Sequence, residues 1–296
     1  MSRGTRVAID VGGTFTDVVT LDGESAALKF DKVPTTPSHP EEGVLDGFAA
    51  SGAPMPDIET FIHGTTLGLN ALLTRRGART GIVTTKGFRD VYLLGRTDRI
   101  PMYDFKYRKP ATLVQRQHIV EVDERLDFEG RVLTPFDEEG AAAAARAIRD
   151  MGLDSVAVCF LHSYVNPDHE VRMAEILQAE APDVVVTISS DLSRQLREFE
   201  RTSTAVLDSY IKPIVRSYLD KLEGVIAERG FAGQFLMTRS GGGAMTASSA
   251  KEAPVNLILS GPAGGVLGAS WFAKAAGYPN LITIDMGGTS LDASLV

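Results

Sequence analysis

The sequence is poor in cysteine and lacks long apolar runs. Its one cysteine among 296 residues, Cys159, cannot form a disulfide within the chain, so a reducing compartment is expected. Cys159 lies in the apolar stretch 156–160, which predicts an inert core thiol. No run of about 18 uncharged apolar residues occurs, so no membrane span is expected. The N-terminus leaves no room for a signal peptide before the first strand pattern, and the expected location is the cytoplasm.

Positive charge and several common motifs are also scarce. Thirty Lys and Arg residues face 38 Asp and Glu residues, giving a net charge of −8 without a basic tract, so nucleic acid is not an expected partner. No G-x-x-x-x-G-K-[ST] sequence occurs, and no G-x-G-x-x-G follows the first strand pattern, which argues against P-loop and dinucleotide-binding proteins. No G-x-S-x-G elbow and no H-E-x-x-H spacing is present.

Strand-like and helix-like stretches alternate through the first 190 residues. This alternation predicts an α/β fold with a largely parallel sheet, to which an opening hairpin adds antiparallel pairing. The predicted strands cover residues 7–9, 18–21, 61–63, 80–85, 155–160 and 184–188. The predicted helices cover residues 67–75, 138–151 and 168–180, with Gly77 and Gly152 as C-caps of the first two, and residues 96–114 read as an irregular loop.

Residues 193–229 are almost continuously helical in pattern. Pro213 interrupts this stretch and is expected to kink or split the helix. A long helix between two sheet regions predicts a connector, so we place one domain at residues 1–190 and the start of a second at residues 191–296. The second domain is expected to contain strands at 235–238 and 281–284 and a helix at 263–276.

The strongest motif occurs twice, as D-x-G-G-T-x-x-D at residues 10–17 and 285–292. Each copy follows an apolar strand and precedes another strand-like stretch. Backbone N–H groups in a concave turn can hold an oligophosphate, and glycines leave room for that approach. One such hairpin could be an ordinary Gly-Gly turn, whereas two matched copies predict a nucleotide site. The expected phosphate-binding residues are Gly12, Gly13, Thr14, Thr16, Asp17, Gly287, Gly288, Thr289 and Ser290.

The first aspartate of each copy is expected to act through a metal. Asp10 and Asp285 end their strands, where carboxylates can face a cleft, yet like charges prevent direct contact with phosphate. Mg²⁺ held between carboxylate and phosphate, usually through waters, removes this conflict. Asp10 and Asp285 are therefore the predicted metal-binding and catalytic residues. Asp17 and Asp292 are expected to anchor their hairpins.

These motifs resemble the hydantoinase A/5-oxoprolinase family of the actin-like, sugar-kinase-like ATPase superfamily. The resemblance covers essentially the whole chain and includes H-G-T-T at 63–66, G-I-V-T-T-K-G-F-R-D at 81–90, S-G-P-A-G-G-V at 260–266 and the second hairpin. It implies an actin-like (RNase H-like) ATPase fold. Where family members usually carry Thr-Asp-Val, this sequence has Leu291-Asp292-Ala293. Members are longer, so the adenine-binding motif is expected beyond residue 296, and the isolated chain is expected to be inactive.

The resemblance implies ATP and Mg²⁺ as cofactors and phosphorylation of a carbonyl or amide oxygen. The expected reaction is ATP-dependent hydrolysis of a cyclic amide of the hydantoin or 5-oxoproline type, completed by a hydantoinase B-type subunit or domain, in an oligomer. Alternatives are the ATP-using subunit of an acetone- or acetophenone-type carboxylase, a sugar-type kinase, and a non-enzymatic nucleotide-switched scaffold. The general base stays unassigned.

Four further residues are candidates for the site. His63 is expected to face the same cleft as Asp10 and to take part in catalysis. Thr65 and Thr66 can cap the following helix, and the amides there could face an anion. Arg96, in the irregular loop, could hold an anionic substrate, although a solvated surface position is an equally good interpretation.

Overall fold

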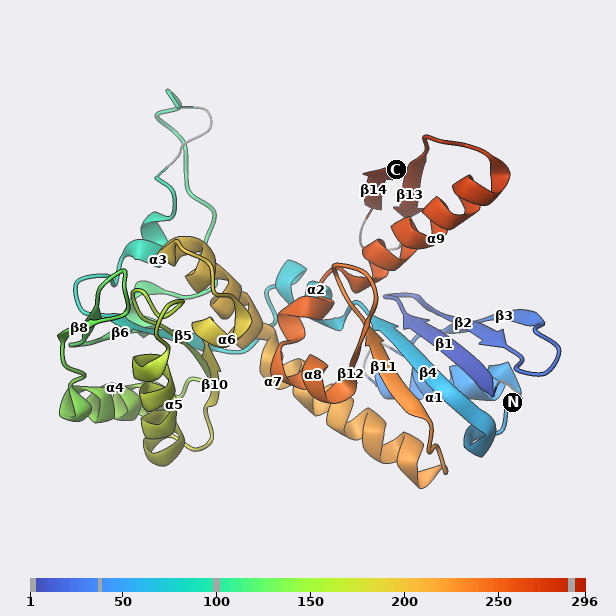
Figure 1. The fold of residues 1–296 in the computed structure, drawn as a ribbon, viewed down its shortest axis with the longest axis horizontal. Helices are drawn as coiled ribbons and strands as arrows, with labels where there is room; N and C mark the ends of the chain where they lie inside the picture. Colours follow the sequence, from blue (N-terminus) through green and yellow to red (C-terminus); the bar gives the residue numbers. More distant parts are fainter. Residues whose placement is uncertain (1–3, 37–38, 98–101, 287–290) are drawn as a thin grey trace. The chain divides into compact units, whose positions relative to one another are not determined.

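The computed structural model describes residues 4–36, 39–97, 102–286 and 291–296. The chain forms two compact units (Figure 1). Unit 1 joins Met1–Thr74 to Val215–Val296, and unit 2 comprises Arg75–Ile214. The boundary that we predicted near residue 190 does not coincide with this division. The observed units differ from the prediction because strands far apart in the sequence, at 58–65 and 234–238, pair with each other. Local sequence patterns do not reveal such a pairing.

Unit 1 is built on a mixed six-stranded sheet. Two segments that lie far apart in the sequence meet in it, because the strand at 234–238 pairs in parallel with the strand at 58–65. The pairing of β1 with β2 and of β2 with β3 is antiparallel, whereas β1 and β4 are parallel. In sheet order the strands are β12 (Ala244–Thr246), β11 (Gln234–Thr238), β4 (Ile58–Thr65), β1 (Thr5–Val11), β2 (Phe15–Leu21) and β3 (Leu28–Pro34).

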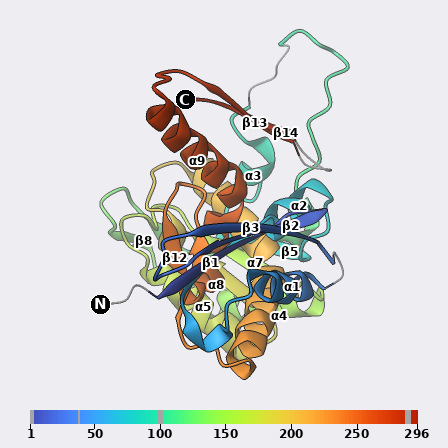
Figure 2. The same ribbon diagram turned by 90° about the vertical axis from the view of Figure 1, so that its right-hand side faces the viewer.

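The two faces of this sheet differ. Val7, Ile9 and Val18 are buried on one face, which helix α1 (Pro40–Ser51) covers (Figure 2). Gly47 permits this close packing, because a Cβ there would lie 3.0 Å from the Val18 side chain. The opposite face carries the intervening residues of each strand, and helix α9 (Ser260–Ala276) lies on that side (Figures 1 and 2).

The remaining elements of unit 1 include a short second hairpin. Strands β13 (Ile282–Met286) and β14 (Leu291–Leu295) pair in antiparallel fashion. The long helix α7 (Glu198–Glu228) contains Pro213, and the division into units falls between Ile214 and Val215. The predicted connector helix is therefore present as one helix that contributes to both units. The other short elements are η1 (Met55–Asp57), α2 (Leu67–Leu73), α8 (Ala247–Glu252) and η3 (Pro254–Leu257).

Unit 2 contains a parallel four-stranded sheet. Its strands in sheet order are β10 (Val185–Ile188), β9 (Ser155–Cys159), β5 (Thr80–Thr85) and β6 (Ile119–Val122). Helices α4 (Glu138–Asp150) and α5 (Asp168–Glu180) pack on one face through a core that includes Val83, Val156 and Met173. Ala205 and Val206 of α7 pack on the other face against Ile82 and Cys159. The further elements are α3 (Val91–Leu94), η2 (Arg116–His118), β7 (Arg125–Leu126), β8 (Val132–Thr134) and α6 (Ser189–Leu192).

The predicted C-cap at Gly77 is wrong. Helix α2 ends at Leu73, and Arg75 instead takes the left-handed conformation, with φ of 56°. Gly77 has a packing role in unit 2, since a Cβ there would lie 2.0 Å from the Tyr210 ring. After α4, Gly152 does adopt φ of 63°, as a residue following a helix C-terminus commonly does. In the part of the chain that the structure describes, no helix has the length and apolar character needed to cross a membrane.

Candidate functional site

Residues of both glycine hairpins line one cavity in unit 1, which we call the hairpin cavity. Its volume is about 450 Å³. Asp10 and Asp285, the first aspartates of the two motifs, both contribute to its wall. The lining also includes Gly12, Gly13, Thr14, Asp17, Lys32, Thr66, Asn70, Gly261 and Asp292. Gly287, Gly288, Thr289 and Ser290 lie outside the described residues.

The two hairpins share a backbone arrangement. In β1 and β2, Asp10 lies directly opposite Asp17. In β13 and β14, Asp285 lies directly opposite Asp292 in the same antiparallel register. The repeated sequence motif therefore corresponds to a repeated strand pairing, with both copies presenting their aspartates to one cavity.

A glycine on the neighbouring strand makes room for Asp10. Gly64 of β4 lies beside Asp10 in the parallel pairing of β4 with β1. A Cβ at position 64 would lie 2.3 Å from Asp10 Oδ1. With any larger residue there, the Asp10 carboxylate would have to move, so Gly64 leaves room for its present position.

The electrostatic environment opposes ionisation of Asp10. Asp10 keeps an exposed surface, yet the protein atoms around its carboxyl group remove part of its hydration. This desolvation, followed by the negative charges of Asp17 and Asp285, raises the pKa of the carboxyl group above the ordinary value. A cation bound beside Asp10 would offset the free-energy cost of ionising its carboxyl group. The site is therefore better suited to a metal ion or an ammonium group than to an isolated anion.

Lys32 is a cavity residue that the sequence analysis did not identify. It lies on β3 opposite Asp17, and its Nζ is 2.6 Å from Asp17 Oδ1 and 5.1 Å from the centre of the Phe15 ring. Asp17, which is expected to anchor its hairpin, thus has a side-chain partner on the neighbouring strand. No motif surrounds Lys32, so only the register between β2 and β3 could have revealed it.

Thr16 and His63 point away from the cavity. Thr16 is fully buried, and its hydroxyl lies 3.0 Å from that of Thr35. His63 lies opposite Ile9 rather than Asp10, so its side chain enters the core face of the sheet. Its Nδ1 donates to the Ile9 carbonyl at 3.0 Å, and its Nε2 accepts from the Tyr218 hydroxyl at 2.7 Å. Our expectation that His63 would share a cleft with Asp10 is incorrect, because side chains alternate along a strand.

The burial of His63 predicts acid sensitivity of unit 1. Burial lowers the pKa of His63 from 6.5 to about 4. The unfolded chain therefore binds the proton more tightly, and stability is lost as the pH falls from 6.5 towards 4, by up to about 3 kcal/mol at about 1.4 kcal/mol per pKa unit. Chemical denaturation at pH 7.5 and 4.5 should show a smaller pH effect in His63→Gln than in wild type. The exposed His39, changed to Gln, is the control; an undiminished pH effect in His63→Gln would refute this account.

The remaining candidates have different surroundings. Thr66 lines the hairpin cavity, where Asn70 Nδ2 donates to its Oγ1 at 3.2 Å. Thr65 is buried, and its Oγ1 accepts from the Leu67 amide at the start of α2. Arg96 belongs to unit 2, where its Nε donates to Glu200 at 2.7 Å. Of these three residues, Thr66 lines the hairpin cavity.

The cavity residues fit a metal that keeps most of its own water. Among the described residues, no group of three or more His, Cys, Asp or Glu side chains is placed to hold a metal ion. Mg²⁺ does not need one, because it is usually held by one or two carboxylates together with water and substrate phosphates. Asp10, whose ionisation is disfavoured until a cation arrives, and Asp285 on the same cavity fit that description.

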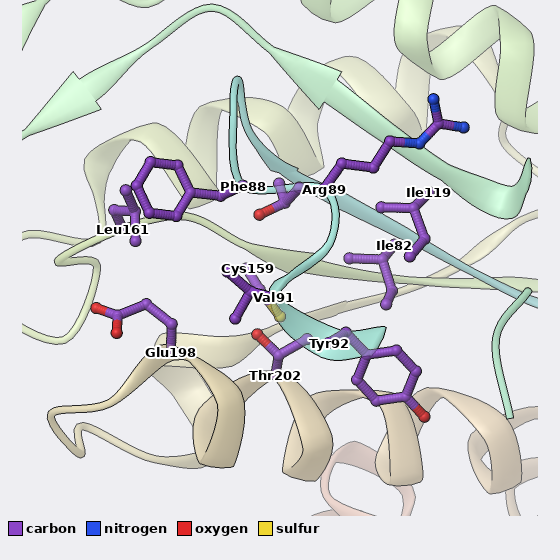
Figure 3. A pocket seen from close by; sticks show the side chains of 11 residues that line it. Ile82, Phe88, Arg89, Val91, Tyr92, Ile119, Cys159, Leu161, Glu198 and Thr202 are labelled. Carbon is purple, nitrogen blue, oxygen red and sulfur yellow. The ribbon is translucent and has the colours of Figure 1, made fainter. Parts of the chain in front are cut away.

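A second cavity, in unit 2, offers little chemistry (Figure 3). Its volume of about 10 Å³ is room for about one water molecule. Cys159 lines it, and burial raises the pKa of this thiol to about 12, so the thiol stays protonated. The guanidinium of Arg89 is directed away from Cys159 (Figure 3) and donates to the Arg116 carbonyl. The prediction of an inert core cysteine agrees with these surroundings.

Comparison with known proteins extends over nearly the whole chain. The acetophenone carboxylase gamma subunit of Aromatoleum aromaticum is 36% identical, covering 98% of this chain and 42% of that protein. The caprolactamase subunit alpha of Pseudomonas jessenii is 33% identical, covering 98% of this chain and 43% of that protein. The chain thus spans less than half the length of these relatives.

Two solved structures share the fold. The nucleotide-free structure of acetone carboxylase matches with a TM-score of 0.90 and 30% identity, covering 99% of this chain and 44% of that one. The crystal structure of the ATP-dependent caprolactamase from Pseudomonas jessenii matches with a TM-score of 0.82 and 31% identity, covering 98% of this chain and 43% of that one. These likenesses confirm the predicted ATPase-type α/β fold.

Family profiles match both parts of the sequence. The profile described as the hydantoinase/oxoprolinase N-terminal region matches residues 6–181, and the profile described as hydantoinase/oxoprolinase matches residues 201–296. Together with the shared fold, these matches establish that the chain belongs to the hydantoinase/oxoprolinase family.

Proposed function

We propose that this protein uses ATP and Mg²⁺ to activate the carbonyl oxygen of a small amide, and that this activation leads to hydrolysis of a cyclic amide. The observation that carries the proposal is the hairpin cavity, in which two equivalent Asp-Gly-Gly hairpins present Asp10 and Asp285 to one space. The ATP dependence of the caprolactamase relative supports the proposal.

Each part of the cavity has a proposed task. The backbone at Gly12 and Gly13 approaches the phosphates, because no side chain projects there. Asp10 and Asp285 would hold Mg²⁺, which would supply positive charge beside the phosphates. Lys32, which pairs with Asp17 at the cavity wall, supplies a positive charge to the cavity. These residues bind and orient the nucleotide, and no covalent intermediate with the protein is required.

The proposed chemical step is phosphoryl transfer to the carbonyl oxygen. A lone pair of that oxygen attacks the γ-phosphorus of ATP, the bond from this phosphorus to the β–γ bridging oxygen breaks, and ADP leaves with the electron pair. Phosphorylation turns the oxygen into a good leaving group. A hydantoinase B-type subunit would then complete the hydrolysis, which is consistent with the naming of several relatives as subunits of larger enzymes.

A carboxylase subunit is the second candidate. The gamma subunit of acetophenone carboxylase and the acetone carboxylase structure are among the most similar proteins. In such an enzyme the same activation would act on a ketone, and the partner would form a carbon–carbon bond rather than add water. The hairpin cavity serves both reactions equally well.

The proposal is tested by nucleotide turnover. ATP binding and ADP release are measured with the protein and any copurifying subunit, with hydantoin, 2-pyrrolidinone, ε-caprolactam or acetone present. We expect removal of Mg²⁺ to weaken ATP binding at least tenfold, and ADP release to require a carbonyl compound. Product analysis then separates hydrolysis from carboxylation. ATP binding that is indifferent to Mg²⁺, or turnover that responds only to hydroxylated compounds such as sugars, would contradict the proposal.

A further inference from the structure

An ion pair between Lys32 and Asp17 lies at the wall of the hairpin cavity. Both residues line this cavity, and Lys32 Nζ is 2.6 Å from Asp17 Oδ1. The two side chains are 54% and 55% exposed, and ion pairs at such exposed positions contribute little to the stability of a fold. Stability therefore gives little reason for this pair, whereas its place gives the lysine access to a bound ligand.

Strand register brings Lys32 to the cavity. Lys32 of β3 lies opposite Asp17 of β2, which lies opposite Asp10 of β1. Residues in such a row project from the same face of a sheet, so the three side chains lie on the cavity side. Lys29 of the same strand projects from the other face, where its Nζ donates to the Ala50 carbonyl near the end of α1. One strand thus provides a lysine at the cavity and a lysine outside it.

Two contacts hold the ammonium group of Lys32 in place. Besides Asp17, the Phe15 ring lies close to it, with 5.1 Å between Nζ and the ring centre, a distance at which a cation is attracted to an aromatic face. Phe15 also lines the cavity. An ammonium group has three N–H donors, so its contact with Asp17 does not exhaust its capacity to donate. Lys32 is therefore positioned at the cavity and can still donate to an anionic ligand.

The charge of the cavity gives such a donor a task. Among the described residues that line the cavity, Lys32 is the one basic side chain, whereas Asp10, Asp17, Asp285 and Asp292 are acidic. A single Mg²⁺ offsets only part of the negative charge of a triphosphate. Lysine is a common phosphate-binding residue because it places a positive point charge beside the phosphate oxygens. Phosphate in this acidic cavity therefore has most to gain from contact with Lys32.

We propose that Lys32 donates directly to the phosphates of ATP, and that this contact makes the cavity prefer ATP to ADP. The inference rests on the proposed function, and it adds a residue that determines specificity for the nucleotide. Asp17 and Phe15 hold the lysine where it can reach a bound phosphate. Because Mg·ATP is more negative than Mg·ADP, removal of the Lys32 charge costs ATP more of its affinity.

Two nucleotides and two lysines test the contact. Mg·ATP and Mg·ADP affinities are measured by calorimetry on the protein with any copurifying subunit, for wild type, Lys32→Met, Lys32→Arg and the control Lys29→Met. We expect Lys32→Met to weaken Mg·ATP binding about tenfold to a hundredfold and Mg·ADP binding by less. Lys32→Arg, which keeps the charge, should keep the preference for ATP, and Lys29→Met should match wild type. Unchanged Mg·ATP affinity in Lys32→Met, or equal losses for both nucleotides, would overturn the proposal.

A double-mutant cycle separates contact with phosphate from neutralisation of Asp17. In Asp17→Asn the carboxylate is gone, so a lysine that served only to neutralise it would be dispensable. We expect Lys32→Met to weaken Mg·ATP binding about tenfold or more in this background as well. Disappearance of the loss in Asp17→Asn would refute direct contact with phosphate. Wild-type protein that binds no Mg·ATP would instead refute the proposed function.

Discussion

Replacing Arg201 with alanine is expected to destabilise unit 2 by about 3–5 kcal/mol. The Arg201 side chain is 1% exposed, and its three nitrogens donate to Ser189 Oγ, the Gln195 carbonyl and the Phe160 carbonyl. Glu170, which is fully buried nearby, accepts from the Phe160 amide and from the hydroxyl of Ser189. Removing the arginine leaves the Phe160 and Gln195 carbonyls without this donor, takes a positive charge away from the hydrogen-bond network that includes Glu170, and opens a cavity. Chemical denaturation measures the loss.

An exposed arginine of the same unit provides the control. Arg146 is 3.3 Å from Glu180 at the surface, and exposed pairs contribute about 0–1 kcal/mol. Arg146→Ala should therefore unfold at nearly the wild-type denaturant concentration. The double variant Glu170→Gln/Arg201→Met removes both charges and should recover part of the stability that Arg201→Ala loses. If Arg201→Ala were no less stable than Arg146→Ala, the buried network would not stabilise unit 2.

Replacing Asp10 with asparagine is expected to act in opposite directions on stability and on nucleotide binding. The nucleotide-free protein should unfold at a higher temperature, because the neutral amide avoids ionisation beside Asp17 and Asp285. Mg·ATP affinity should fall about ten- to a hundredfold, which corresponds to the 1.5–3 kcal/mol of an interaction with a charged group. A residue whose replacement stabilises the empty protein while weakening Mg·ATP binding is retained for function rather than for stability.

The pH dependence gives the stability effect a defined sign. Because the folded pKa of Asp10 is raised above 3.8, the folded state binds more protons than the unfolded state between these two values. Stability therefore falls as the pH rises through this window, and the cost persists at neutral pH. The advantage of Asp10→Asn should be complete at pH 7.5 and absent below 3.8. Asp57 is exposed and lies outside the hairpin cavity. Asp57→Asn should therefore change neither the stability nor the Mg·ATP affinity.

Local signals in the sequence were sufficient for the hairpins and for several helices. The Gly-Gly turns between apolar strands predicted β1 with β2 and β13 with β14, in which the aspartates face each other. Helix α5 coincides with the predicted range 168–180, where polar and apolar residues alternate with helical spacing. In these segments the local preference and the tertiary structure agree.

Long-range pairing and close packing could not be predicted in this way. Helix α1 was missed because Gly43 and Gly47 interrupt its apolar pattern, yet both face the sheet at contact distance. The place of β11 beside β4 depends on residues more than 160 positions apart. The same limit explains His63 and Lys32, whose orientations depend on register with β1 and β2 rather than on any motif.

The central claim is that the two hairpins bind one metal-bound triphosphate, and a calorimetric titration tests it directly. ATP is titrated into wild type, Asp10→Asn and the control Asp57→Asn, each with Mg²⁺ and with a chelator. The account predicts Mg²⁺-dependent binding in wild type and Asp57→Asn, and binding at least tenfold weaker in Asp10→Asn. Equal Mg·ATP affinity in all three proteins would contradict it.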